Sequence, residues 1–347
     1  MVASNKKKRK HRCPAIAHFS FYVFVFLISS FYAFVTGVSA QRSLTLVEMN
    51  CENLFDCLHD EGKDDYEFTP SGARHWTPSR YWRKLNGLAQ TILASSASLP
   101  DLVALVEVEN DSVLHALTRR SLLRNGGYEY LMTSSPDVRG VDVALLYRPL
   151  AFLPLCYDML SVEPLTGMRP TRDILYVKGL TLPADTLHVF VVHAPSRRGG
   201  ERSTRPYRQR MAEVLTRATS AIIAKTPDAR IVVAGDFNST LDGHSLRYII
   251  GQGLVSATSG VTGTHGARSN YRYHGRWEQI DHVLVSPSLL PCIAESSVFD
   301  APFLLEPDEL YGGVKPFRTY NGFRYQHGFS DHLPLVVVFS LQELPHN

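Results

Sequence analysis

The amino-acid sequence predicts an α/β fold in which buried sheets are flanked by helices. Short apolar runs rich in β-branched residues recur along the chain, and several are continuous, as expected for strands that are covered on both faces. Stretches with apolar residues at helical spacing lie between some of these runs. The composition, 44% hydrophobic and 20% charged, is that of a globular protein and excludes intrinsic disorder. The 347 residues suffice for a sizeable core.

The first forty residues have the layout of a secretory signal. Lys6–Arg12 is a dense positive run, residues 15–35 are almost wholly apolar, and small residues occupy Val38–Ala40, where a signal peptidase would cut. We therefore expect a signal over residues 1–40 and a single folded domain over 41–347. The alternative is an uncleaved membrane anchor formed by the apolar stretch. Either way the domain is exported, to be secreted or periplasmic in the first case and membrane-anchored in the second.

The net charge of +3 is set by this leader, which holds six of the 36 basic residues and no acidic one. The remaining chain has 30 basic against 33 acidic residues, a net charge of −3. A general electrostatic attraction to nucleic acid is therefore not supported, and any basic site must be local.

Four cysteines remain after the leader, and they are scattered without the close spacing of a metal site. Export permits disulfides, so the sequence is compatible both with free thiols and with one or two bridges. The four are Cys51, Cys57, Cys156 and Cys292.

In chain order, the apolar runs predict strands at Leu44–Met49, Leu102–Val106, Val141–Tyr147, Leu187–Val192, Ile231–Ala234, Ile280–Val285 and Leu333–Phe339. Helical spacing predicts helices at Ser79–Ser95, Arg205–Ala224 and Asp242–Gly251. The first begins after Thr77-Pro78, a helix-start signal. Residues 259–276 and 306–328 have no clear periodicity, and we expect them to be long loops.

Polar side chains follow or precede most of the predicted strands. Strand ends place such groups at the rim of a sheet, where a cleft can form. The residues are Asn50, Glu107, His193, Asp236, Asn238, Asp281, Asp331 and His332.

The segment Gly235–Asn238 is the most informative of these. Asp236 and Asn238 are two residues apart, so in an extended segment both project to one side. A carboxylate there can accept a proton from an attacking water, and an amide N–H can stabilise a developing anion. Capping of a strand-to-helix turn explains the tetrapeptide equally well.

The other polar residues suggest a cation site, and they add a second acid and an imidazole. Asn50 and Glu107 together offer oxygen ligands suited to Mg²⁺. His332 can donate to a phosphoryl oxygen, and Asp281 is a candidate partner that fixes its tautomer. Taken singly, each motif is also compatible with a solvated strand end or a surface turn.

Taken together and in order, these blocks resemble the endonuclease/exonuclease/phosphatase superfamily, as an exported, bacterial-type member with the deoxyribonuclease-I-like fold. The resemblance spans roughly residues 44–340. It rests on Met49–Phe55, Leu105–Glu107, Gly140–Ala144, Val192–His193, Gly235–Asn238, Gln279–His282 and Ser330–His332.

The resemblance implies a four-layer sandwich of two mixed sheets between helices, and hydrolysis of a phosphate ester with a divalent cation, usually Mg²⁺ with Mn²⁺ as an alternative. It implies that Asn50 and Glu107 hold the metal, with Asp331 as a further contributor. It further implies that Asp236 activates water, that Asn238 stabilises the transition state, and that His332, oriented by Asp281, binds the scissile phosphate. His193 matches the second histidine of the deoxyribonuclease-like branch. Glu109, two residues after Glu107, is an alternative metal contact.

A cluster of arginines follows His193 and indicates a local contact to a phosphate backbone. A solvated, charged start of a helix is the competing interpretation. The candidate substrate-binding residues are Arg197, Arg198, Arg202 and Arg205.

These features favour an exported, metal-dependent phosphodiesterase, in first place an endonuclease acting on DNA or RNA. The alternative is a phosphatase or phosphodiesterase acting on phosphoinositides, sphingomyelin or small phosphate esters. A non-catalytic binding module is a third hypothesis, which the full catalytic set disfavours. The superfamily covers too many substrates for the fold to decide between them.

Overall fold

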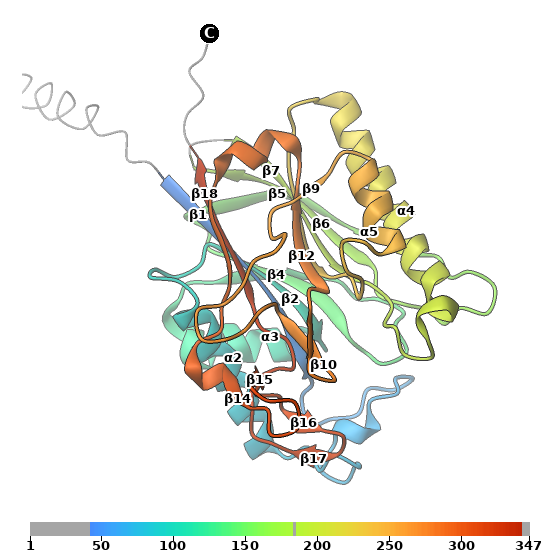
Figure 1. Ribbon diagram of the computed structural model, residues 1–347, viewed down its shortest axis with the longest axis vertical. Helices are drawn as coiled ribbons and strands as arrows, with labels where there is room; N and C mark the ends of the chain where they lie inside the picture. Colours follow the sequence, from blue (N-terminus) through green and yellow to red (C-terminus); the bar gives the residue numbers. More distant parts are fainter. Residues whose placement is uncertain (1–41, 183–184, 342–347) are drawn as a thin grey trace, which may run out of the picture. The chain divides into compact units, whose positions relative to one another are not determined.

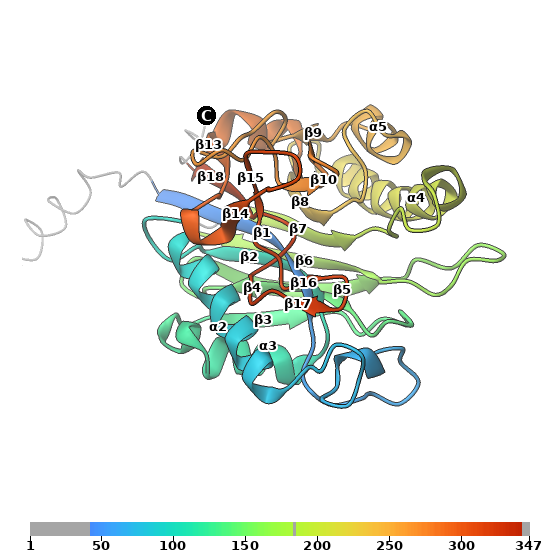
Figure 2. The same cartoon turned by 60° about the horizontal axis from the view of Figure 1, so that its bottom comes forward.

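The protein was analysed in a computed structural model that describes residues 42–182 and 185–341. The expected leader, residues 1–40, lies outside the described residues. Two six-stranded mixed sheets lie face to face, and helices cover their outer faces (Figures 1 and 2). The predicted α/β class and the four-layer sandwich that the resemblance implies are both confirmed.

The first sheet has the strand order β13-β18-β1-β2-β4-β3. β1 pairs in parallel with β2 and antiparallel with β18, so the first and last strands of the domain are neighbours. The strands are β1 (Arg42–Leu54), β2 (Leu102–Val108), β3 (Glu129–Met132), β4 (Asp142–Tyr147), β13 (Ile293–Val298) and β18 (Leu335–Leu341).

The second sheet has the order β5-β6-β7-β8-β12-β9, and β7 and β8 form its parallel pair. β7 and β8 are buried along most of their length, as their continuous apolar sequences predict. The strands are β5 (Phe152–Leu160), β6 (Ile174–Thr181), β7 (Asp185–His193), β8 (Arg230–Asp236), β9 (Val255–Ser256) and β12 (Asp281–Val285).

Helices pack on the outer face of each sheet. α2 (Pro78–Ala94) and α3 (Asp111–Arg119) cover the first sheet, and α4 (Glu201–Lys225) and α5 (His244–Gly251) cover the second, on opposite sides of the molecule in Figure 2. Three apolar clusters result: one between the sheets and one under each pair of helices. Short 3₁₀ helices are η1 (Tyr66–Phe68), η2 (Leu122–Asn125), η3 (Pro287–Cys292) and η4 (Pro302–Leu304).

Every predicted strand and helix forms, with ends that differ by a few residues. The two predicted loops are less irregular than expected, because they contain small antiparallel hairpins. Such two- or three-residue strands are too short for a periodic signal. The hairpin strands are β10 (Tyr271–Tyr273), β11 (Arg276–Glu278), β14 (Leu305–Pro307), β15 (Val314–Pro316), β16 (Tyr320–Asn321) and β17 (Arg324–Tyr325).

The four cysteines of the domain are free thiols. Only Cys51 among them is buried, while Cys156 is exposed, so the alternative with disulfides does not hold in this structure. Among the described helices, none combines the length and the apolar character needed to cross a bilayer.

Candidate active site

Three predicted site residues lie abreast on neighbouring strands of the second sheet. His193 ends β7 and pairs in register with Asp236, the last residue of β8, which in turn pairs with Asp281, the first residue of β12. Gly235 permits this close pairing: its φ is +145°, and a Cβ atom there would lie 1.9 Å from the carbonyl oxygen of Val192. The sheet therefore presents one imidazole and two carboxylates at a single rim.

The first sheet contributes Asn50 and Glu107 through irregular backbone. The β1–β2 pairing shifts register between Asn50 and Leu54, and the β2–β4 pairing shifts between Val106 and Val108. Glu107 has a φ of +60°, a left-handed conformation that is uncommon for a residue with a side chain. A bulge of this kind redirects one side chain out of the regular alternation. Such backbone is concentrated at functional sites.

The two rims meet at a pocket of about 270 Å³. Seven predicted site residues line it: Asn50, Glu107, His193, Asp236, Asn238, Asp331 and His332. Asp281 does not line the pocket but lies behind His332, which it contacts. The structure thus brings the predicted catalytic and metal-binding residues together from both sheets.

Asp236 is the most heavily hydrogen-bonded of these groups. Its Oδ1 accepts from the backbone N–H of Asn238 at 2.7 Å, and its Oδ2 accepts from the side-chain amides of Asn50 at 3.2 Å and Asn238 at 3.1 Å. Burial raises the pKa of Asp236 to about 8, helped by the charge of Asp281. The site therefore holds more buried negative charge than its hydrogen bonds compensate.

The expected extended geometry from Asp236 to Asn238 is wrong. The strand ends at Asp236, and Asn238 has a φ of +47°. The two side chains still face one pocket because the left-handed turn brings the Asn238 amide back to the Asp236 carboxylate. The same amide also donates to the carbonyl of Ala194 at 3.1 Å. Asp236 and Asn238 therefore share one pocket as expected, but because of the turn and not because of an extended backbone.

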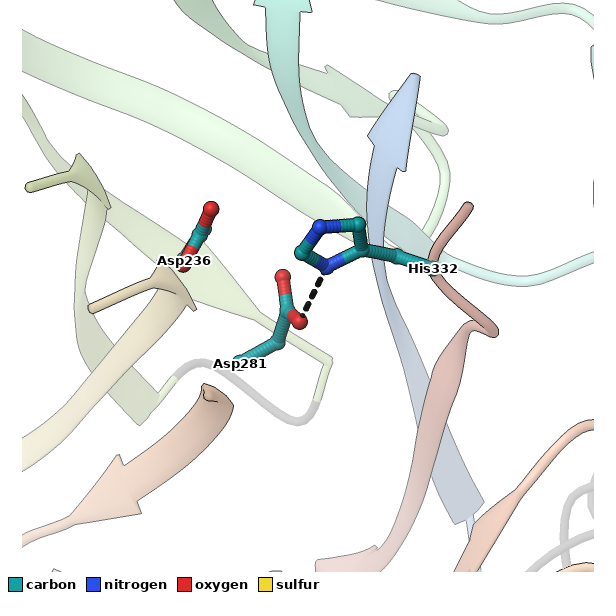
Figure 3. A group of neighbouring side chains, drawn as sticks. All are labelled: Asp236, Asp281 and His332. Carbon is teal, nitrogen blue, oxygen red and sulfur yellow. Dashed lines mark hydrogen bonds and ion pairs between the residues drawn. The ribbon is translucent and has the colours of Figure 1, made fainter. Parts of the chain in front are cut away.

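His332 and Asp281 form a hydrogen-bonded pair, with Asp236 beside them (Figure 3). The Nδ1 atom of His332 lies 2.6 Å from Oδ2 of Asp281. Burial by itself lowers the pKa of His332, but the negative charges of Asp281, Asp331 and Asp236 outweigh burial and raise that pKa well above its usual range. The raised pKa favours the protonated imidazole, whose Nε2 lies 4.0 Å from Asp331 Oδ1 and can donate to a ligand in the pocket.

His193 has the opposite protonation state. It is buried, and burial together with the positive charges of Arg172 and Arg139 holds its pKa well below the usual range. Its Nε2 lies 3.7 Å from Glu107 Oε1 and 3.8 Å from Asp236 Oδ2. The pocket thus pairs one neutral histidine with one charged histidine, a separation of pKa values that is typical of acid–base sites.

Sequence analysis missed Glu48, which lies behind the site on β1. Neither oxygen of its fully buried carboxyl has a hydrogen-bond partner, and neither does Oδ1 of Asp281. Burial, together with the charges of Asp281 and Asp236, raises the pKa of Glu48 well above its usual range. Protonation of Glu48 would give it an O–H that can donate to Asp281, which relieves the repulsion between the two carboxyl groups.

The predicted arginine contacts are only partly at the site. None of Arg197, Arg198, Arg202 and Arg205 lines the catalytic pocket. Arg197 pairs with Glu278 at 2.6 Å, and Arg202 and Arg205 are exposed residues on the first turns of α4. Arg198 lines a neighbouring cavity of about 630 Å³. The helix start carries this part of the cluster, as the competing interpretation held.

Other arginines take the predicted place. Arg74 and Arg318 line the pocket, and Arg139 donates to Glu107 Oε1 at 3.2 Å. Arg318 lies 2.9 Å from Asp331 and 3.6 Å from the buried Glu52. Only Arg318 had a sequence signal, since it lies in the loop just before Ser330. The others reach the site through long-range folding that no local pattern records.

Glu109 is not the alternative ligand of the same cation. Its side chain does not line the catalytic pocket, and its Oε2 accepts from the backbone N–H of Asp56 at 2.6 Å. The bulge between Val106 and Val108 breaks the alternation that would have put Glu107 and Glu109 on one side.

The fold and the acids, amides and histidines at its rim indicate the protein family. Residues 45–341 match the endonuclease/exonuclease/phosphatase family, and the chain belongs to this family. The protein is accordingly a phosphoric ester hydrolase. A comparison with curated protein sequences finds none that matches the chain.

Several solved structures share the fold. A mannosyl-6-phosphatase from Bacteroides thetaiotaomicron has a TM-score of 0.58 and 16% identity, over 85% of this chain and 98% of that one. An endonuclease/exonuclease/phosphatase family protein from the same organism has a TM-score of 0.57 and 15% identity, over 88% and 98%. The human nocturnin catalytic domain with bound sulfate has a TM-score of 0.52 and 16% identity, over 88% and 97%.

Members of this family typically use a divalent cation, and the residues present fit one. Asn50 and Glu107 supply amide and carboxylate oxygens at the pocket, and the raised pKa of Asp236 marks uncompensated negative charge beside them. When bound, such an ion neutralises charge on a phosphoryl group.

Proposed function

We propose that the protein is an exported, divalent-metal-dependent phosphodiesterase that cleaves DNA or RNA internally, with Mg²⁺ as its ion and Mn²⁺ as a substitute. The observation that carries the proposal is an arginine-lined cavity that adjoins the catalytic pocket. Ser196 lines both spaces, and Arg139 lines the cavity while donating to Glu107. An extended phosphodiester chain needs cationic contacts beyond its scissile phosphate, whereas a small ester does not.

The cavity supplies such contacts from four arginines. Arg139 and Arg172 are fixed by Glu107 and Asp137, with guanidinium-to-carboxylate distances of 3.2 and 3.0 Å. Arg169 and Arg198 form no ion pair within the described residues, so their charges are available to phosphates. The buried His193, which stands between Glu107 and Asp236, also supports a member of the nuclease-like branch.

The pocket residues divide the reaction between them. Asp236 accepts the proton of the attacking water, and Asn50 and Glu107 would hold the cation, with Asp331 as a further contributor. His332 donates from Nε2 to a phosphoryl oxygen while Asp281 holds Nδ1. Asn238 shifts one amide N–H from Asp236 to the phosphoryl oxygen that gains negative charge as the water oxygen bonds to phosphorus. The P–O bond to the leaving group then breaks, and the leaving oxygen takes up a proton from solvent. Neutral His193 donates to a second phosphoryl oxygen.

A specific observation favours a second candidate, a phosphatase or phosphodiesterase acting on phosphoinositides, sphingomyelin or small phosphate esters. The β16–β17 hairpin contributes Tyr320 and Gly322 to the pocket lining, and it limits the space to about 270 Å³. A pocket of that size accommodates one phosphorylated headgroup or sugar. One of the similar folds is itself named a mannosyl-6-phosphatase.

The deciding experiment compares substrates. We would incubate the purified protein with supercoiled plasmid, structured RNA, a phosphoinositide and sphingomyelin panel, and sugar phosphates, in Mg²⁺, Mn²⁺ or EDTA. The proposal predicts metal-dependent nicking of a polynucleotide that is lost in Asp236→Asn and His332→Ala. Turnover of lipids or sugar phosphates with both polynucleotides intact would establish the second candidate instead.

The arginine cavity gives a sharper test. In Arg169→Ala and Arg198→Ala, we expect KM for a polynucleotide to rise and the salt dependence of binding to weaken by about one unit of slope per arginine. Arg217→Ala is the matched control, because Arg217 is an exposed arginine of α4 that lines neither cavity. An unchanged salt slope in both cavity variants would contradict a polynucleotide path through this cavity.

A further inference from the structure

A second group of carboxylates lies outside the catalytic pocket, under the loop that follows β1. Asp60, Asp65 and Glu109 each bring a carboxylate oxygen to within 4.8 Å of the other two. None of the three lines the catalytic pocket. The group connects the loop to Glu109, which follows β2 and lies two positions after Glu107 of the catalytic site.

The group carries more negative charge than its surroundings compensate. Within the described residues, no lysine or arginine pairs with any of the three carboxylates, and the one basic side chain that contacts them is the imidazole of His59, at Asp65 Oδ1. Lys63, the basic residue of the loop, donates instead to the carbonyls of Ser135 and Asp137, at 3.1 and 2.9 Å. Buried carboxylates without a counter-charge are costly, so they normally coordinate a metal or are paired.

Glu109 gives the second observation. It is 5% exposed, its Oε2 accepts from the backbone N–H of Asp56, and its other oxygen, Oε1, is buried without any hydrogen-bond partner. One carboxylate oxygen of Glu109 lies within 4.8 Å of oxygens of Asp60 and Asp65, and a buried carboxylate oxygen without any donor lacks a positive ligand. Neither an amide donor nor a hydroxyl reaches it from the described residues.

The loop holds these oxygens in place. The backbone N–H of Asp60 donates to Asp65 Oδ2 at 2.9 Å, which closes the loop on itself. Phe55 stacks on Phe68 with ring centroids 4.3 Å apart, so both ends of the loop are anchored in the core. Asp64 donates its backbone N–H to Val138 at 2.7 Å. Asp60 is exposed, which leaves an open side for water ligands.

We propose that Asp60, Asp65 and Glu109 form a second, structural cation site that binds Ca²⁺. Three carboxylates on a loop provide a hard, oxygen-only donor set, and Ca²⁺ accepts irregular loop geometry with several waters. Mg²⁺ demands a near-ideal octahedron at about 2.0–2.1 Å, whereas Ca²⁺, at about 2.3–2.6 Å, tolerates the irregular placement of ligands on a loop. The ion braces the ends of β1 and β2, which carry Asn50 and Glu107.

The test uses CaCl₂ and the full chain, after treatment with EDTA. We would measure Ca²⁺ binding by calorimetry and hydrogen–deuterium exchange of the peptides over residues 56–68. Added Ca²⁺ should slow exchange in this segment at least threefold and raise the melting temperature, and Mg²⁺ should need at least ten times the concentration. Equal effects of the two ions would overturn the assignment to Ca²⁺.

Variants separate this site from the catalytic one. Asp60→Asn and Asp65→Asn should abolish the slowing of exchange, and Asp60 is exposed, so its variant tests the proposal even if the second fails to fold. Glu61→Gln removes a neighbouring exposed carboxylate outside the group and should behave as the wild type. Glu107→Gln should retain the effect. Protection by Ca²⁺ that survives in Asp60→Asn, or is lost in Glu107→Gln, would overturn the proposal.

Discussion

Asp236 and Asp281 lie directly opposite each other across the antiparallel β8–β12 pair, and both are almost fully buried. Like charges in such a cross-strand pair are destabilising. Asp281 is compensated by the protonated His332, but Asp236 has only amide and backbone donors. The Asp236–Asp281 pair therefore does not serve stability, and we assign its two members separate roles in catalysis.

The Asp281–His332 contact predicts a shift of the pH–activity profile. His332 must be protonated to donate, and the charge of Asp281 contributes to its raised pKa. In Asp281→Asn that pKa falls, so activity should be lost at a lower pH, and kcat should drop about 10²- to 10⁴-fold. The profile of kcat/KM against pH measures this shift. Asp158→Asn, an exposed carboxylate on β5, is the control, and an unmoved basic limb in Asp281→Asn would contradict the pairing.

Asp236 predicts how the stability of the metal-free protein depends on pH. Its pKa is raised on folding, so the folded state binds the proton more tightly than the unfolded state. The stability that this group contributes is present below about pH 4 and is lost as the pH rises to about 8. In EDTA, Asp236→Asn should therefore become progressively more stable relative to the wild type over this range. Melting temperatures measured across this pH range test the prediction. A difference between the two proteins that stays constant with pH would contradict this assignment.

Glu48 predicts a tolerant and an intolerant substitution at one position. Because burial raises its pKa well above the usual range, we expect an uncharged carboxyl, and Glu48→Gln keeps its shape and donor. We expect Glu48→Gln to cost less than about 1.5 kcal/mol of unfolding free energy. Glu48→Ala leaves a cavity and should cost about 2–5 kcal/mol. Denaturant unfolding at pH 7 distinguishes them, and a severe loss in Glu48→Gln would show that a charged Glu48 is required.

Arg318, which the structure places at the pocket, should matter more for activity than Arg202, which the sequence suggested. Arg318 lines the pocket and lies 2.9 Å from Asp331, so Arg318→Ala should lower kcat/KM about tenfold or more. Arg202 is an exposed residue of the first turns of α4, and Arg202→Ala should change kcat/KM less than twofold. Steady-state kinetics on one substrate compare the two, and a larger effect of Arg202→Ala would restore the sequence-based assignment.

The fold and the pocket residues were predictable because each depends on a local pattern. Continuous apolar runs marked β1, β2, β7, β8 and β12, and the polar residues that end them meet at the rim because strand ends of facing sheets converge. Asn50, Glu107 and Asp236 follow from that rule.

The remaining features could not be predicted because they depend on tertiary contacts. Arg139 reaches Glu107 across 32 positions of the chain, and Glu48 looks like any strand residue until its burial is known. The bulge at Glu107 also reversed the expected side of Glu109, since alternation fails wherever an extra residue enters a strand.

The central claim is that this pocket hydrolyses phosphate esters with a divalent cation, whatever the natural substrate. Hydrolysis of bis(p-nitrophenyl) phosphate, a diester, and of p-nitrophenyl phosphate, a monoester, by the purified protein in Mg²⁺ or EDTA tests it for both substrate classes. The account predicts metal-dependent release of nitrophenol that falls at least 10³-fold in Asp236→Asn, the variant that removes the proposed base. Hydrolysis that persists in Asp236→Asn, or that is unaffected by EDTA, would contradict it.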